Sequence, residues 1–172
     1  MLTVLLECRD NEQELAHTLA VLVAGAVDGL VSDVIVLDHG SQDASAAVAD
    51  AAGCRFLTQW SLEETLLSAR GDWVMLLEAG ARPQSGWIEE VSEYAAIAGM
   101  PARFSPSRRF RRPFFKRLMA RTGALENGYL ISKRQAAALA RPGMDLDALA
   151  KSASCRKLRS ELIPAWVIRE GR

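Results

Sequence analysis

The sequence is poor in the patterns that mark several protein classes. Its three cysteines, Cys8, Cys54 and Cys155, are widely spaced and follow no metal-ligand pattern. An odd number of scattered cysteines argues against a disulfide framework and indicates a reducing compartment. No G-x-G-x-x-G sequence follows the first predicted strand, which excludes the dinucleotide-binding pattern of Rossmann dehydrogenases.

Long apolar runs are also absent. The most apolar stretch, residues 19–37, is interrupted by Asp28 and Asp33, so it falls short of the roughly 20 uninterrupted apolar residues of a membrane span. The first residues carry neither the basic start nor the small-residue cleavage site of a signal peptide. We therefore expect a cytoplasmic protein. With 172 residues, 49% of them apolar, the chain can bury a core, and we expect a single domain over residues 1–172.

The charges are divided unequally along the chain. Residues 1–100 contain 16 acidic and 4 basic residues, a net charge of −12. Residues 101–172 contain 5 acidic and 17 basic residues, a net charge of +12. Two interpretations remain open: the two halves face each other, or the second half faces an anionic partner.

Residues 1–98 alternate between predicted strands and predicted helices. Asn11 with Glu14, and Ser61 with Glu64, have capping-box spacing. This alternation predicts an α/β fold with a mostly parallel sheet and helices on both faces. The predicted strands are Leu2–Glu7, Val34–Leu37, Cys54–Leu57 and Trp73–Glu78, and the predicted helices are Glu12–Val27, Ala44–Ala52, Ser61 to about Arg70, and Trp87–Ala98.

The stretch Asp33–Asp43 is central to this prediction. A buried β-branched strand stops at Asp38, Gly40 allows a bend, and Ser41 is expected to cap the following helix. Open α/β sheets hold ligands at the carboxyl ends of their strands, so Asp38 could accept hydrogen bonds from a ribose or a base. The alternative is that Asp38 and Ser41 only cap the helix.

The strand order 3-2-1-4 would bring three strand ends to one crevice. In that order Arg9, Asp38 and Glu78 would rim the crevice at the topological switch point. His39 would lie beside it, although a lone histidine in a turn is more often solvated than catalytic.

Residues 99–172 are less regular. We predict strands over Gly128–Ser132 and Leu162–Ile168, and Pro164 would place the second of these at a sheet edge. Ser132 and Gln135 form a further capping box. The predicted helices are Pro113–Ala120, a helix from Ser132 to about Ala140, and Leu146–Ser154 with Asp145 as its cap.

Three segments of the first half carry recognisable motifs: Glu7–Leu19 (ECRDNEQELAHTL), Val34–Ser45 (VIVLDHGSQDAS) and Ala69–Trp87 (ARGDWVMLLEAGARPQSGW). They resemble the nucleotide-sugar domain of family 2 glycosyltransferases, which have the GT-A fold. Asn11-Glu12 matches the end of the family's first loop, and Asp38 with Gly40-Ser41-Gln42-Asp43 matches its second strand end. Leu125–Leu139 and Met144–Ala150 resemble the acceptor-side segments more loosely.

The resemblance implies a GT-A-like fold with a nucleotide-binding half, residues 1–98, and an acceptor-side half, residues 99–172. It implies transfer of a sugar from a nucleotide-diphosphate donor to an acceptor hydroxyl, which in relatives is often lipid-linked. The implied roles are nucleotide contact for Cys8, Arg9, Asn11, Asp38 and Ser41, a Mn²⁺ or Mg²⁺ ligand for Glu78, and a catalytic base for Asp145 or Asp147. Cys8 could instead pack as a small apolar residue.

The chain departs from the family at the chemically active positions. Glu78-Ala79-Gly80 replaces the family's Asp-x-Asp, and a glycine offers no side-chain ligand to a hard cation. Asp145-Leu146 replaces the Glu-Asp pair that carries the base, and Asp147 follows as an alternative. Two hypotheses remain: an active sugar transferase, and a catalytically inactive relative that serves as a binding or regulatory module.

The segment 103–121 holds eight basic residues and no acidic one. It could contact an anionic membrane surface or a lipid-linked acceptor, clamp the donor diphosphate, bind nucleic acid, or form a solvated basic face against the acidic half. Nucleic acid is the least favoured interpretation, because the segment matches no recognised nucleic-acid module. Its aromatic residues are Phe104, Phe110, Phe114 and Phe115.

Overall fold

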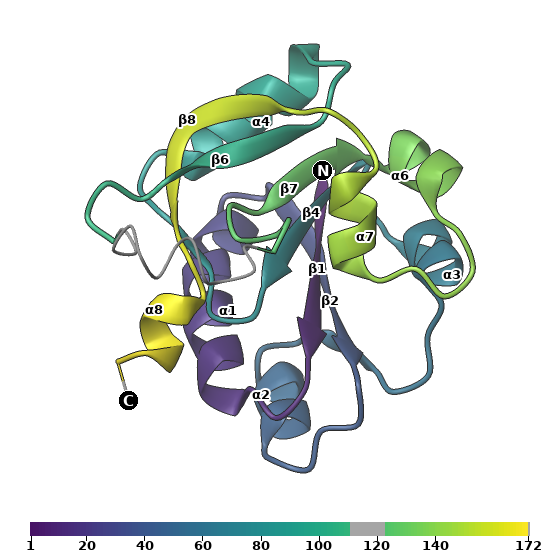
Figure 1. The fold of residues 1–172 in the computed structure, drawn as a ribbon, viewed down its shortest axis with the longest axis vertical. Helices are drawn as coiled ribbons and strands as arrows, with labels where there is room; N and C mark the ends of the chain where they lie inside the picture. The colour runs from purple at the N-terminus through teal and green to yellow at the C-terminus, as the bar shows by residue number, and fades with distance from the viewer. Residues whose placement is uncertain (111–122, 172) are drawn as a thin grey trace.

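A computed structural model describes residues 1–110 and 123–171. An eight-stranded sheet forms its centre, in the order β3-β2-β1-β4-β7-β6-β8-β5 (Figure 1). The predicted α/β class, with a mostly parallel sheet, is confirmed. The strands are β1 (Leu2–Cys8), β2 (Val31–Asp38), β3 (Arg55–Leu57), β4 (Trp73–Glu78), β5 (Arg82–Pro83), β6 (Ala102–Pro106), β7 (Tyr129–Ser132) and β8 (Arg156–Ile163).

The first half of the sheet follows the predicted order. Strands β3, β2, β1 and β4 are neighbours and run parallel. Apolar side chains fill both faces of β1, β2 and β4, which explains why these strands appear in the sequence as continuous apolar runs. In the register, Glu7 pairs with Glu78, and Cys8 pairs with Asp38.

The second half of the sheet differs from the prediction at three strands, the first of which is β5, at Arg82–Pro83, where no strand was predicted. β6 lies in a segment where no strand was predicted, and β8 covers Arg156–Ile163 where the prediction was Leu162–Ile168. The charged residues of β8 hide its alternation, although Leu158 and Leu162 are buried. Pro164 follows the strand and cannot donate a ladder hydrogen bond. The apolar residues after it form helix α8 (Trp166–Arg169) instead of a strand.

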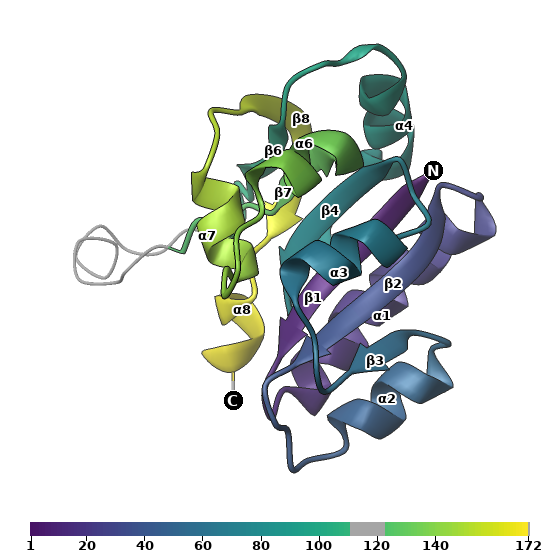
Figure 2. The same ribbon diagram turned by 90° about the vertical axis from the view of Figure 1, so that its right-hand side faces the viewer.

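Helices cover both faces of the sheet (Figure 2). On one face, α1 (Glu12–Val27), α2 (Ser45–Ala51) and α4 (Trp87–Ile97) contribute to one apolar cluster. On the other face, α3 (Leu62–Ser68), α6 (Lys133–Leu139) and α7 (Leu146–Lys151) contribute to a second cluster. The sheet thus has a separate apolar core on each face.

The helix caps test the sequence signals directly. Ser61 accepts a hydrogen bond from the Glu64 N–H, and Ser132 accepts one from the Gln135 N–H, as predicted. The capping box of Asn11 is wrong, because its side chain makes no cap hydrogen bond to α1. The Ser41 cap is also wrong, since α2 begins four residues later, at Ser45.

Two further expectations concern membranes and the basic segment. The helix predicted for Pro113–Ala120 lies outside the described residues. No helix within residues 1–110 or 123–171 combines the length and apolar character needed to cross a bilayer.

Candidate functional site

The carboxyl ends of β1, β2 and β4 place acidic side chains on both faces of the sheet. Register partners in parallel strands share a face, and successive residues alternate. Glu7 and Glu78 therefore lie on the face of α7, while Cys8 and Asp38 lie on the face of α1. The structure thus places Asp38 and Glu78 on opposite faces of the sheet, although each residue ends a strand that pairs with β1.

Asp38 holds the turn that follows β2. Its carboxylate is buried, 5% exposed, and accepts hydrogen bonds from the Gly40 N–H at 3.0 Å and the Ser41 N–H at 3.1 Å. The Ser41 hydroxyl donates a further bond to Asp38 at 2.6 Å. Gly40 accommodates the bend with a φ of +87°. Asp38 and Ser41 therefore shape the loop between β2 and α2.

Hydrogen bonds join this loop to the loop that follows β1. The Asp10 N–H donates to the Ser41 hydroxyl at 3.0 Å, and the Gln42 N–H donates to the Asp10 carboxylate at 2.7 Å. Asn11 accepts from the Arg9 N–H at 2.9 Å. The buried Cys8 thiol lies 3.7 Å from the Ser41 hydroxyl. The structure therefore brings together the predicted nucleotide-contact residues, with the Arg9 side chain exposed at their rim.

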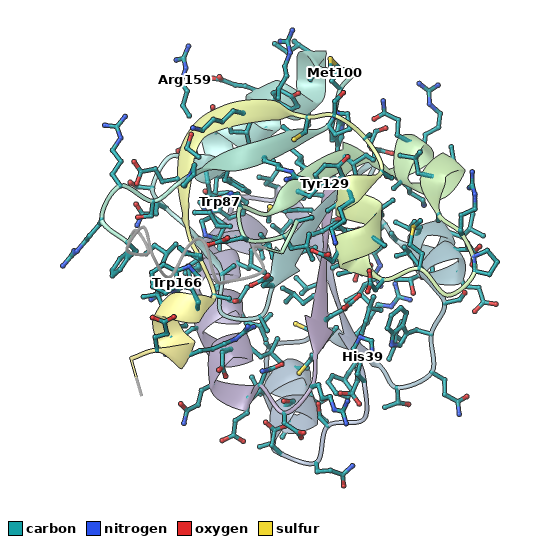
Figure 3. The ribbon with its side chains drawn as sticks, in the orientation of Figure 1. His39, Trp87, Met100, Tyr129, Arg159 and Trp166 are labelled. Atoms are coloured by element: carbon teal, nitrogen blue, oxygen red, sulfur yellow. The ribbon has the colours of Figure 1, made fainter. Side chains whose placement is uncertain are left out.

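Glu7 connects these loops to α7, a contact that the sequence analysis missed. Its carboxylate accepts a hydrogen bond from the Leu146 N–H at 2.7 Å and lies 3.4 Å from His39 Nε2. The His39 ring meets the Trp60 ring edge-on, with the centroids 5.2 Å apart. Figure 3 shows His39 beside the carboxyl end of β2. A charged residue at the end of an otherwise apolar strand was the available signal for Glu7.

Glu78 and Asp147 approach the same point from two different elements. A Cβ atom built on Gly123 would lie 3.2 Å from Glu78 Oε1 and 3.4 Å from Asp147 Oδ1. Asp147 also accepts a hydrogen bond from the Ala124 N–H and pairs with Lys151 Nζ, both at 2.5 Å. The predicted metal ligand and one of the two predicted bases therefore lie together beside Gly123.

The two candidate bases differ in their surroundings. Burial alone would raise the pKa of Asp147, but hydrogen bonds from Lys151 and Ala124 outweigh it and lower that pKa below its usual value. Asp147 is therefore ionised at neutral pH. Asp145 is exposed and accepts a hydrogen bond from the Ala148 N–H at 2.7 Å, which confirms its predicted role as the cap of α7.

The described part of the basic segment packs against its own half of the sheet. Arg103 donates to the Ala150 carbonyl at 2.6 Å, and its guanidinium lies 5.4 Å from the Tyr129 ring centroid. Arg108 pairs with Glu161 at 3.3 Å. Phe104 is 1% exposed and belongs to the core. One of the aromatic residues of this segment, Phe104, thus contributes to core packing.

Comparison with solved structures supports the GT-A fold. The structure of glucosyl-3-phosphoglycerate synthase from Mycobacterium tuberculosis with Mn²⁺, UDP and glucosyl-3-phosphoglycerate is similar at a TM-score of 0.64 and 18% identity, over 99% of this chain and 75% of that chain. The same synthase with Mn²⁺ and UDP-glucose is similar at a TM-score of 0.61 and 19% identity, over 91% and 68%. A further mycobacterial protein is similar at 0.62 and 22%, over 86% and 58%.

These similarities concern the fold, because the sequence identities are low. No protein-family model matches the chain. No curated protein sequence matches it. The expected fold class, an α/β GT-A-like sheet with helices on both faces, is confirmed by the neighbours and by the strand order.

Proposed function

We propose that the protein binds a nucleotide-sugar at the carboxyl ends of β1, β2 and β4 and transfers the sugar to an acceptor hydroxyl. The observation that carries this proposal is the meeting of Glu78 and Asp147 beside Gly123. Open α/β sheets bind ligands at the switch point of the strand order, which here lies between β1 and β4. Neighbours of the same fold were solved with UDP and with UDP-glucose.

In this proposal the joined loops after β1 and β2 receive the nucleoside. Asp38 and Ser41 fix the loop backbone, the buried Cys8 lies beside Ser41, Asn11 accepts from the Arg9 N–H, and the exposed Arg9 side chain offers a cation. Residues 1–98 would form the nucleotide-binding half of a single domain. Residues 99–172 would supply the acceptor side.

Asp147 is the proposed general base. It would accept the proton of the acceptor hydroxyl while the hydroxyl oxygen bonds to the anomeric carbon of the sugar. The bond from that carbon to the donor phosphate oxygen breaks, and its electron pair leaves with the nucleoside diphosphate. The position of Asp147 next to Glu78 supports this choice over Asp145, whose carboxylate caps α7.

The basic second half of the chain bears on the identity of the acceptor. A neighbour of the same fold was solved with phosphoglyceric acid, an anionic acceptor. The basic second half would suit an anionic acceptor or a lipid-linked one presented at an anionic membrane surface. The protein would then act as a peripheral protein at the cytoplasmic face.

A catalytically inactive binding module is the second candidate. Two observations favour it: Gly80 stands where the family has a second metal-binding aspartate, and the Asp147 carboxylate is already paired with Lys151. Such a module would keep the nucleotide site and lose the transfer step.

An assay of nucleoside diphosphate release separates the two candidates. The protein would be incubated with UDP-sugars and GDP-sugars, with 3-phosphoglycerate or a lipid-linked acceptor added. Release that depends on the acceptor and falls about 100-fold or more in Asp147→Asn would support transfer. Nucleotide binding without release would support the binding module.

A further inference from the structure

Position 80, where the family motif has its second carboxylate, is crowded by Ala165. A Cβ atom on Gly80 would lie 3.2 Å from the Cα, Cβ and carbonyl oxygen atoms of Ala165, and the φ of Gly80 is +103°. The Gly80 N–H donates to the Thr18 hydroxyl at 2.8 Å, which in turn donates to the Ala81 carbonyl at 2.9 Å. A carboxylate at this position would therefore strain the backbone and require Ala165 to shift by a few tenths of an ångström.

The other carboxylates of the site are already engaged. Asp147 binds Lys151 and the Ala124 N–H, and Glu7 binds the Leu146 N–H and contacts His39. Among residues 1–110 and 123–171, no group of three or more histidine, cysteine, aspartate or glutamate side chains is arranged to hold a metal ion. Asp147, which lies beside Glu78, is thus already held by Lys151 and the Ala124 N–H, and the described residues offer no set of three such side chains to a divalent metal.

A permanent cation lies at the same segment. Arg169, on α8, donates from Nη2 to the carbonyl oxygen of Ala79 at 3.5 Å. The buried Ala165 and the hydrogen bond from Trp166 Nε1 to Glu126, 3.1 Å long, anchor this helix. Figure 3 shows Trp166 on α8, on the opposite side of the parallel strands from His39. The helix that packs against position 80 therefore also places the Arg169 guanidinium group beside Ala79.

We infer that Arg169 binds the diphosphate of the nucleotide at the segment Glu78–Gly80, and that this binding requires no divalent metal. The inference rests on the proposed nucleotide site. A guanidinium group stays charged at every physiological pH and binds phosphate oxygens through two parallel hydrogen bonds. In a transfer step it would stabilise the negative charge that gathers on the departing diphosphate, without taking up a proton.

Titration calorimetry with UDP and GDP tests the inference, in EDTA and again with Mn²⁺. We expect binding in EDTA, with a Kd that Mn²⁺ changes by less than about two-fold. Arg169→Ala should weaken binding about 10- to 100-fold, the usual effect of losing a hydrogen bond to a charged group. The Kd of Arg169→Lys should lie between the Kd of the wild type and that of Arg169→Ala. Arg134→Ala, an exposed arginine on α6, is the matched control and should bind as the wild type does.

Three outcomes would count against the inference. Binding that needs Mn²⁺ and disappears in Glu78→Gln would overturn it while leaving the nucleotide site in place. Binding in EDTA that is equally strong in Arg169→Ala, with the variant folded by circular dichroism, would remove Arg169 from the site. If the folded wild type binds neither nucleotide under either condition, the proposed nucleotide site itself fails.

Discussion

Gly80 adopts a backbone conformation that suits the helix packed against it. Its φ of +103° disfavours any residue with a Cβ atom, and Ala165 occupies the space that a side chain would need. The glycine at position 80 therefore suits the placement of α8. An aspartate at position 80 would strain the backbone.

Gly80→Ala is expected to lower the free energy of unfolding by about 2–4 kcal/mol, because backbone strain and overpacking add. The control is Gly53→Ala, where φ is +70° but no atom lies within 4 Å of the added Cβ. This variant should lose only the strain, about 1–2 kcal/mol. Urea denaturation of the two variants measures the difference, and equal losses would show that Ala165 does not restrict position 80.

Asp147 should make folding stability depend on pH. Burial raises the pKa of Asp147, but hydrogen bonds from Lys151 and Ala124 lower it below its usual value of 3.8. A lowered folded-state pKa contributes stability above the unfolded pKa, and this contribution is lost as the pH falls through the folded pKa. The stabilising effect of the ionised carboxylate is therefore complete at neutral pH.

Asp147→Asn should lower the free energy of unfolding at pH 7 by about 1 kcal/mol, because the pair with Lys151 is partly exposed. The difference from the wild type should shrink below about pH 4, where the wild-type carboxylate also becomes neutral. Urea denaturation at pH 7, 5 and 3 checks this. A difference that stays constant over this range would mean that the charge of Asp147 does not stabilise the fold.

At the scale of elements, the sequence predicts what local chemistry determines. The apolar runs of β1, β2 and β4, and the caps Ser61 and Asp145, all occur where expected. β8 was misplaced because its buried leucines alternate with charged residues, and α8 was missed because an apolar run after a proline also resembles a strand. The contact between Glu78 and Asp147 joins distant parts of the chain, so only the folded structure reveals it.

Asp145 offers a test that separates capping from catalysis. Asp145→Ala removes the bond to the Ala148 N–H and should lower the free energy of unfolding by about 1 kcal/mol. Asp145→Ser keeps an N-cap acceptor but removes the carboxylate, and should keep both stability and any transfer activity. Thermal unfolding and nucleoside diphosphate release measure the two effects. A stable Asp145→Ser variant without activity would move the base from Asp147 to Asp145.

Across the whole molecule, the described ion pairs compensate only part of the charge asymmetry between residues 1–100 and residues 101–172. Arg55 pairs with Asp33 in the acidic half, and Arg108 pairs with Glu161 in the basic half. On β8, Lys157 is exposed, while the buried Phe104 on β6 belongs to the core. The described part of β8 thus presents positive charge at its surface, and we predict that a membrane contact there would be electrostatic.

Such a contact predicts binding to vesicles that contain anionic lipid, with little binding to neutral vesicles and a loss at high salt. The double variant Lys157→Gln with Arg159→Gln should bind about 30-fold more weakly, since each basic residue near an anionic surface contributes about 1 kcal/mol. Arg70→Gln with Arg134→Gln removes the same charge from exposed positions outside β8 and is the control. Vesicle sedimentation measures all three proteins. Equal losses in both variants would assign the attraction to net charge alone, and binding that ignores lipid charge and salt would exclude an electrostatic contact through β8.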